Sequence, residues 1–169
     1  MEDYAIHWFR RDLRVHGNIC LKRQFSKFNG RVVGFFCFDK SFLSRDDFSA
    51  NRFQFFIETL SELKKELKSV GSDLYVVDAL PEKGFQEILS NLKKRPTSVS
   101  FSRDYEPFAL ARDKKIKEYL ESEEIDVYTN RDHLLIEPWE LSKGDGDPYK
   151  VYTPFSRTWL DIFEKEKIY

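Results

Sequence analysis

The chain has 169 residues, of which 41% are hydrophobic and 34% are charged, and its formal net charge is −1. This length is enough for one domain with a sizeable core, and the apolar content excludes an intrinsically disordered chain. The near-neutral charge excludes an overall basic field of the kind that attracts nucleic acids, and the longest apolar run is too short to span a bilayer.

The first part of the chain alternates short apolar runs with amphipathic stretches. A buried strand is predicted over residues 4–9 and a helix over 18–28, for which Asn18 is a suitable N-cap. The uninterrupted apolar run over 32–38 is typical of a strand that is covered on both faces, as in a parallel sheet.

A polar loop over 44–47 leads to the longest predicted helix, which begins near residue 51 and ends at Gly71. Its apolar side chains recur at the helical period on one stripe, made of Phe53, Phe56, Ile57, Leu60, Leu63, Leu67 and Val70. A third strand is predicted over 74–77 and a third helix over 85–92.

Two more strands, over 99–101 and 125–128, flank a helix that begins at Pro107 and runs to about residue 121. Proline suits the first helical position, because its missing N–H would have no helical partner there. Strands that alternate with helices in this way predict an α/β fold. We expect a doubly wound, Rossmann-like, five-stranded parallel sheet of order 3-2-1-4-5 over residues 1–130, with helices on both faces.

The pattern changes after residue 129. A short apolar piece over 133–136 and a flexible turn over 143–148 precede Thr153-Pro154, which we expect to cap and open a further helix. That helix has an apolar face and no later segment to bury it. We therefore expect residues 131–169 to be a linker and a helix that belongs to a part missing from this chain.

Charged clusters follow three of the predicted strands. They are Arg10-Arg11-Asp12 after the first strand, Asp39 after the second, and Arg103-Asp104 with Glu106 after the fourth. Ligands of open parallel sheets bind beyond the carboxyl ends of the strands, near the point where the strand order reverses. The sequence therefore predicts a ligand crevice at this edge.

Motifs for catalysis and metal binding are missing. The sequence has no glycine-rich phosphate loop and no nucleophile elbow, and its histidines and its two cysteines, Cys20 and Cys37, lack zinc-site spacing. We expect a pocket for a flat ligand, with no catalytic residue and no metal ligand. Two isolated thiols without a secretory segment indicate a cytoplasmic protein with no membrane association.

Five motifs give the chain a resemblance to a known family. They are WFRRDLRVHGN, FFCFD, NRFQFFIETLSEL, FSRDYEPFALARD and YKVYTPFSRTW, and they span residues 4 to about 160. In this order they resemble the N-terminal α/β antenna domain of the DNA photolyase and cryptochrome family.

The resemblance implies a light-driven flavoprotein whose missing C-terminal helical domain binds FAD and damaged DNA. The full-length protein would be a deoxyribodipyrimidine photo-lyase, a carbon–carbon lyase that repairs cyclobutane pyrimidine dimers by electron transfer from reduced FAD. This chain would hold a light-harvesting chromophore, and alone it would be inactive. A cryptochrome-like blue-light photoreceptor without repair activity, or a small-ligand binding module without a role for light, are the alternatives. The oligomeric state stays open.

The resemblance also implies a chromophore. Folate-binding members carry Asn-Glu where this chain has Phe108 and Ala109, so a deazaflavin is favoured over a folate. The residues that the resemblance assigns to its site are Phe36, Cys37, Asp39, Arg52, Asp104 and Glu106. Purely structural roles are open for three of them: Asp39 ending a strand, Arg52 pairing with Asp46 or Asp47, and Glu106 capping a helix. We assign Arg10, Arg11, Asp12 and Arg14 mainly to contacts with the missing domain, and Arg112-Asp113 to an architectural pair.

Overall fold

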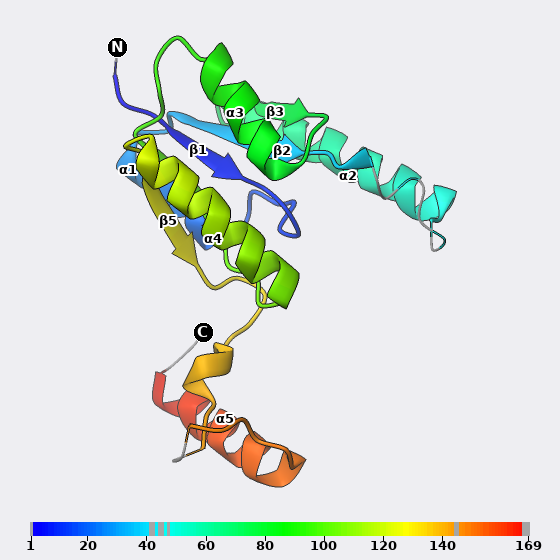
Figure 1. Cartoon of the computed structure of the whole chain (residues 1–169), viewed down its shortest axis with the longest axis vertical. Helices are drawn as coiled ribbons and strands as arrows, with labels where there is room; N and C mark the ends of the chain where they lie inside the picture. Colours follow the sequence, from blue (N-terminus) through cyan, green and yellow to red (C-terminus); the bar gives the residue numbers. More distant parts are fainter. Residues whose placement is uncertain (1, 41–42, 44–45, 47, 144–145, 167–169) are drawn as a thin grey trace. The chain divides into compact units, whose positions relative to one another are not determined.

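The computed structural model describes residues 2–40, 43, 46, 48–143 and 146–166. The chain divides into two compact units, residues 1–130 and 131–169, which are shown in Figure 1. The predicted loop over 44–47 and the turn over 143–148 lie partly outside the described residues. Within the described part of the chain, no helix is both long enough and apolar enough to cross a membrane.

The first unit is a five-stranded parallel sheet of order β3-β2-β1-β4-β5, which confirms the predicted fold. Its strands are β1 (Ala5–Trp8), β2 (Val32–Cys37), β3 (Leu74–Val77), β4 (Ser98–Ser102) and β5 (Asp126–Asn130). Its helices are α1 (Ile19–Lys27), α2 (Ala50–Ser69), α3 (Pro81–Asn91) and α4 (Pro107–Ser122). Strand β1 lies at the centre, because Ala5 is in register with Val32 of β2 on one side and with Ser98 of β4 on the other.

Each face of the sheet packs against two helices (Figure 1). One core joins Trp8 and Phe35 of the sheet with apolar side chains of α3 and α4, and the other joins Phe9 and Phe36 with those of α1 and α2. Successive side chains of a strand point to opposite faces, so neighbours along β2 enter different cores. This arrangement explains why the run over 32–38 is apolar at almost every position.

The predicted N-cap of α1 and the predicted start of α4 are both present. The Asn18 side chain accepts a hydrogen bond from the Leu21 backbone N–H (3.0 Å) and so caps α1. Pro107 occupies the first turn of α4, as predicted. Helix α3 begins at Pro81 rather than near residue 85, because the proline provides a helix start four residues before the first large apolar side chain.

The apolar stripe of α2 is shorter than predicted. Leu60, Leu63 and Leu67 are buried, whereas Ile57 and Val70 are 40% and 48% exposed. The N-terminal part of α2 extends beyond the sheet in Figure 1, so this part of the helix lacks strands to pack on. Val70 is the residue that follows the last turn.

The second unit contains a short 3-10 helix, η2 (Pro138–Glu140), and α5 (Tyr152–Glu166). Helix α5 begins one residue before Thr153, so the predicted cap is wrong: Thr153 lies in the first turn, and the Phe155 N–H reaches back to the Val151 carbonyl (3.4 Å). The predicted apolar piece over 133–136 forms neither helix nor strand. In α5, the rings of Trp159 and Phe163 stack with centroids 5.2 Å apart.

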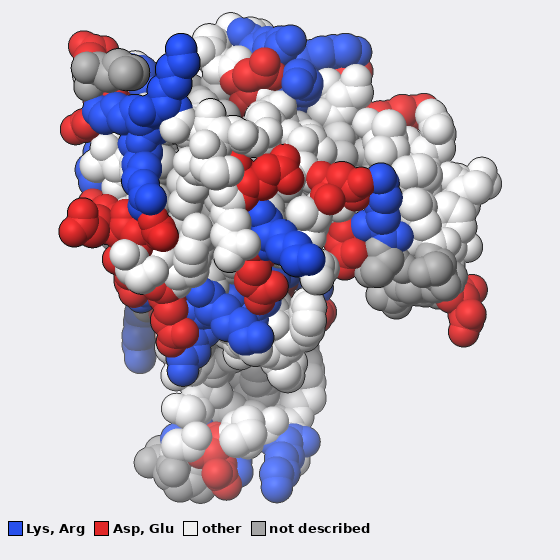
Figure 2. Space-filling view, turned by 45° about the horizontal axis from the view of Figure 1, so that its top comes forward, with Lys and Arg blue, Asp and Glu red and all other residues white. Residues whose placement is uncertain are grey.

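Exposed charges of both signs are mixed over the surface. Figure 2 shows Lys and Arg side chains interspersed with Asp and Glu over the face that it displays. Several form exposed ion pairs within one helix, such as Lys65 with Glu62 and Lys117 with Glu121. Pairs of this kind contribute little to stability.

Candidate functional site

Arg11 joins the loops that follow β1 and β4. Because these strands are parallel neighbours, their carboxyl ends open onto the same edge of the sheet. The Arg11 guanidinium contacts Glu106 through Nη2 (2.9 Å to Oε2) and Asp104 through Nε (3.4 Å to Oδ2). The structure thus brings together two of the carboxylates that sequence reasoning assigned to the site.

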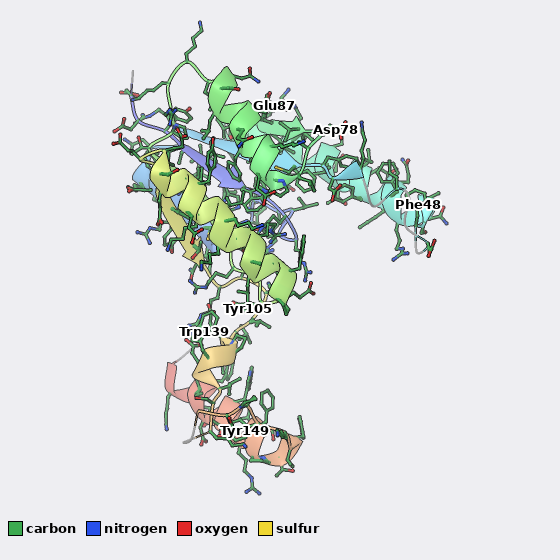
Figure 3. The ribbon with its side chains drawn as sticks, in the orientation of Figure 1. Phe48, Asp78, Glu87, Tyr105, Trp139 and Tyr149 are labelled. Atoms are coloured by element: carbon green, nitrogen blue, oxygen red, sulfur yellow. The ribbon has the colours of Figure 1, made fainter. Side chains whose placement is uncertain are left out.

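The two carboxylates have different surroundings. Asp104 is only 6% exposed; its Oδ1 accepts a hydrogen bond from the Tyr105 N–H (2.9 Å), and its Oδ2 faces both Arg11 and, at 3.9 Å, Arg112. Glu106 occupies the N-cap position of α4 but makes no capping bond with its side chain, which is 63% exposed. Asp104 is therefore an anchor within the fold, and Glu106 is the carboxylate that faces solvent. Figure 3 marks the intervening Tyr105 at the start of α4.

Arg10 is used inside the first unit. Its Nη1 donates to the Asp113 carboxylate of α4, its Nη2 donates to the Ser102 carbonyl, and its guanidinium lies 4.6 Å from the centroid of the Trp8 ring. Arg112 lies over the same ring at 5.3 Å, and its Nε donates to Asp113 (2.9 Å). The expectation that Arg10 mainly contacts a missing domain is wrong, and Arg112-Asp113 is the architectural pair that we predicted.

Asp12 belongs to a buried polar network. Its carboxylate accepts hydrogen bonds from Asn18 Nδ2 (3.0 Å) and the Ser102 hydroxyl (2.7 Å), and it lies 3.5 Å from His7 Nε2. The other imidazole nitrogen of His7 is 2.9 Å from the Ser100 hydroxyl. Asp12 therefore ties the loop after β1 to α1 and β4, which corrects its assignment to contacts with a missing domain.

The pKa of Asp12 reflects this network. Burial alone would raise the pKa of the Asp12 carboxyl. The interactions with His7, the Arg10 backbone N–H and the Ser102 hydroxyl outweigh burial, so this pKa lies well below its ordinary value of 3.8. Ser100, His7 and Asp12 are the residue types of a hydrolytic triad. All three are buried, so a substrate has no access to them.

Phe36 and Cys37 lie on opposite faces of the sheet. Phe36 is buried and packs against Phe56 of α2, with ring centroids 5.6 Å apart. The Cys37 thiol points to α3, where a Cβ placed on Gly84 would lie 2.7 Å from its Sγ. Burial raises the pKa of the Cys37 thiol to about 12, so it is protonated at neutral pH. A ligand on one face of the sheet could therefore contact Phe36 or Cys37, but not both.

Asp39 and Arg52 lie near the carboxyl end of β2. Asp39 is half-buried and is separated from the end of β2 by Phe38, and Arg52 is exposed in the first turn of α2. Asp47, one of the two partners considered for Arg52, lies outside the described residues. Beside them runs a row of rings with centroids 5.6 to 6.1 Å apart, in the order Phe36, Phe56, Phe38, Phe53 and Phe48. Figure 3 places Phe48 at the outer end of α2.

Two hollows lie at the opposite edge of the sheet. One, of about 820 Å³, is lined by residues 29–33 and 70–73 together with Glu2 and Tyr4, and the other, of about 430 Å³, lies between α1 and β5. Their lining includes residues that precede the strands or open them. Ligands of open parallel sheets bind at the carboxyl ends of the strands, which is the edge opposite to these hollows.

The described residues contain no group of three or more His, Cys, Asp or Glu side chains placed to hold a metal ion. The side chains near the carboxyl ends of β1 and β4 include arginines and carboxylates that pair with each other. Such pairs can hold and orient a ligand through charge-assisted hydrogen bonds.

Comparison with known proteins decides the family. A family model described as DNA photolyase matches residues 5–168. The chain belongs to the DNA photolyase family. It is 31% identical over 155 residues to a deoxyribodipyrimidine photo-lyase from Alkalihalophilus pseudofirmus, covering 90% of this chain and 32% of that protein. It is 36% identical over 160 residues to an uncharacterized 31.6 kDa protein from Synechococcus, covering 92% of this chain and 55% of that one.

Solved photolyases share the fold of this chain. A class III photolyase from Agrobacterium tumefaciens matches with a TM-score of 0.78 and 28% identity over 93% of this chain and 31% of that one. An archaeal photolyase from Sulfolobus tokodaii, described with two FAD molecules that imply a novel light-harvesting cofactor, matches with a TM-score of 0.70 and 28% identity over 90% of this chain and 33% of that one. The chain thus spans between a third and about half of the length of these relatives.

Sequence reasoning missed the position of Arg11. We placed Arg11 among the contacts with a missing domain, yet it contacts Asp104 and Glu106. The available signal was the predicted strand order, which makes the loops after β1 and β4 neighbours. This topology favours ion pairs between an arginine in one of these loops and the carboxylates in the other.

Proposed function

We propose that this chain is the light-harvesting antenna domain of a DNA photolyase, and that it binds a chromophore rather than performing the repair chemistry. The observation that carries the proposal is the character of the carboxyl edge in a chain of this family. Its exposed charged groups, such as Arg11 and Glu106, suit the binding of a ligand, and Ser100, His7 and Asp12 are buried out of reach of a substrate.

The residues at this edge fit a planar, oxygen-rich chromophore in part. The exposed Glu106 carboxylate can accept a hydrogen bond from a ring or side-chain hydroxyl, and Arg52 can meet an anionic group. Asp39 completes this set, with Asp104 anchoring the loop that carries Glu106. Phe36 and Cys37 pack in the cores on opposite faces of the sheet. In this proposal they support the end of β2 and do not both contact the chromophore.

A deazaflavin is favoured over a folate, because Phe108 and Ala109 stand where folate-binding members carry Asn-Glu. The Sulfolobus tokodaii relative, described with two FAD molecules that imply a novel light-harvesting cofactor, supports a second chromophore in a protein of this kind without favouring its type. When bound, such a chromophore would absorb light and pass the energy to a flavin.

The activity of the whole protein is part of the same proposal. A C-terminal helical domain would bind FAD and damaged DNA, and excited reduced FAD would split cyclobutane pyrimidine dimers by electron transfer. The relative from Alkalihalophilus pseudofirmus, a deoxyribodipyrimidine photo-lyase, supports this assignment. The free thiols of Cys20 and Cys37 are consistent with a cytoplasmic location.

An absorption and action spectrum of the full-length protein, purified natively, tests the proposal. We expect a flavin band together with a second band whose excitation drives dimer repair. A preparation without any flavin band would contradict a role in light-driven chemistry. Flavin photochemistry without repair of dimers would instead indicate a cryptochrome-like photoreceptor.

A further inference from the structure

One of the two hollows at the amino edge of the sheet has walls of opposite charge. It measures about 430 Å³ and lies between α1 and β5. Helix α1 contributes the cations Arg23 and Lys27, and the chain from the end of α4 into β5 contributes the carboxylates Glu121, Glu124 and Asp126. Ligands of open parallel sheets usually bind at the other edge, so side chains rather than topology specify a ligand here.

Two opposite charges on these walls do not pair with each other. The Arg23 guanidinium carbon lies 3.7 Å from the centroid of the Tyr128 ring, and Arg23 makes no ion pair within the described part of the chain. Glu124 likewise makes no ion pair with a described residue, whereas its neighbour Asp126 pairs with Lys27 at 3.8 Å. The hollow thus presents an unpaired cation on one wall and an unpaired carboxylate on the other.

The position of Glu124 is unfavourable for the fold. Its φ of 60° lies in the left-handed region, where a side chain is strained and glycine is favoured. Its carboxylate also follows the C-terminus of α4, where the helix dipole repels a negative charge. A residue that folding disfavours on two grounds points to a role in function.

A buried amide also lines the hollow. Gln24 is 1% exposed, and its Nε2 donates to the Ser98 hydroxyl (2.9 Å). Its Oε1 has no hydrogen-bond partner among the residues that the structure describes, so it is an acceptor open to a ligand. A ligand that carries N–H donors suits this acceptor.

We propose that this hollow binds a small zwitterion of the free amino acid class. Its carboxylate contacts Arg23, and its ammonium group contacts Glu124. A zwitterion matches both charges at once, whereas an anion or a cation matches one charge and is repelled by the other. This site lies at the opposite edge from the proposed chromophore site and does not depend on it.

Titration of the full chain with three zwitterions tests the site. Glycine, 4-aminobutyrate and 6-aminohexanoate carry the same charges at increasing separation, and each is compared with the carboxylate and the ammonium ion of the same chain length. The NMR signals of the Gln24 side-chain amide and the Glu124 backbone amide report binding. We expect at least one zwitterion to bind about tenfold more tightly than both of its singly charged analogues, the size of one charge-assisted hydrogen bond.

Arg23→Gln and Glu124→Gln should each weaken binding of the preferred zwitterion about tenfold. The matched controls are Lys22→Gln, an exposed cation beside Arg23 on α1, and Glu118→Gln, an exposed carboxylate on α4. Both controls should bind the zwitterion as the parent does. Glu124→Gly separates binding from folding: it relieves the left-handed strain and should raise the midpoint of thermal unfolding, while affinity falls as in Glu124→Gln.

Absence of binding for all three zwitterions, or equal binding of the singly charged analogues, would overturn the site. Affinity equal to that of the parent in Arg23→Gln or in Glu124→Gly would overturn it as well. The comparison of ligands uses the parent chain alone, so it decides the question even if a variant does not fold.

Discussion

Arg10 and Asp113 lie 103 positions apart in the sequence, yet they form an ion pair that connects the end of β1 to α4. Their side chains are only 10% and 14% exposed. The same guanidinium donates to the Ser102 carbonyl at the end of β4. This pair therefore fixes α4, which carries Glu106 at its start, against the two strands whose loops form the candidate site.

Asp113→Ala should destabilise the first unit strongly, because it leaves a buried guanidinium without its partner. We expect the free energy of unfolding in urea to fall by about 3 kcal/mol. Glu118→Ala on the same helix removes a carboxylate from an exposed pair with Lys114 and should change this free energy by less than about 1 kcal/mol. Equal effects of the two substitutions would contradict the structural role of the Arg10–Asp113 pair.

The low pKa of Asp12 predicts a defined pH dependence. The carboxyl has a lower pKa in the folded than in the unfolded chain, so its contribution is complete above the ordinary value of 3.8 and is lost as the pH falls below it. Asp12→Asn should cost about 1–3 kcal/mol at neutral pH, because the partners of the carboxylate stay buried. The free energy of unfolding in urea should differ less between parent and variant as the pH falls below 3.8. A difference that does not change with pH would exclude this linkage.

Gly84 allows α3 to approach the sheet closely. A Cβ at this position would lie 2.7 Å from Cys37 Sγ and 2.8 Å from a methyl group of Val77. Gly84→Ala gains up to about 1 kcal/mol of helix propensity but should lose about 1–3 kcal/mol through overpacking, so the net effect is destabilising. Ser90→Ala, at an exposed position of the same helix, is the control in thermal unfolding. A more stable Gly84→Ala variant would show that α3 can shift at no cost.

Glu106→Ala should lower the occupancy of the antenna chromophore without unfolding the domain. Glu106 is exposed and makes no capping bond, so its removal costs the fold little. Chromophore content per protein, measured by absorbance after reconstitution, should fall severalfold, as expected for the loss of one charge-assisted hydrogen bond. Glu121→Ala at the other end of α4 is the control. Equal content in Glu106→Ala and the parent would remove Glu106 from the site.

The 169-residue chain alone should not repair cyclobutane dimers under light. Its carboxyl edge offers groups that bind a chromophore, and the proposal assigns the flavin and the DNA lesion to another domain. The measurement is the loss of dimers from an irradiated oligonucleotide, with and without added reduced FAD. Repair above the rate of free flavin would show that the chain itself carries the reaction.

Most of the fold could be predicted because local patterns determine it. The apolar run over 32–38 indicated a strand covered on both faces, and the spacing of Leu60, Leu63 and Leu67 indicated a helix. Alternation of strands and helices then left few topologies. Local patterns are less accurate where a helix extends past the sheet. Ile57 lies on the predicted apolar stripe of α2 but is exposed, because periodicity does not reveal where the sheet ends.

The charge pairs of the site could not be predicted in the same way. With 28 basic and 29 acidic residues, the sequence offers Arg10 many partners, and only the folded chain selects Asp113. The same holds for the contrast between the buried Asp104 and the exposed Glu106, because both are carboxylates that follow the same strand. Phe36 and Cys37 were assigned to one site by resemblance, although adjacent residues of a strand face opposite sides.

The central position of β1 has a consequence for synthesis of the chain. Strand β1 leaves the ribosome first and can pair with β2 early, but Ser102 follows Asp12 by 90 positions. Until β4 has been made, one long edge of β1 stays open, and Asp12 and His7 keep water in place of the hydroxyls of Ser102 and Ser100. A nascent chain that stalls before β4 therefore exposes the middle of its sheet, where a second nascent chain could pair with it.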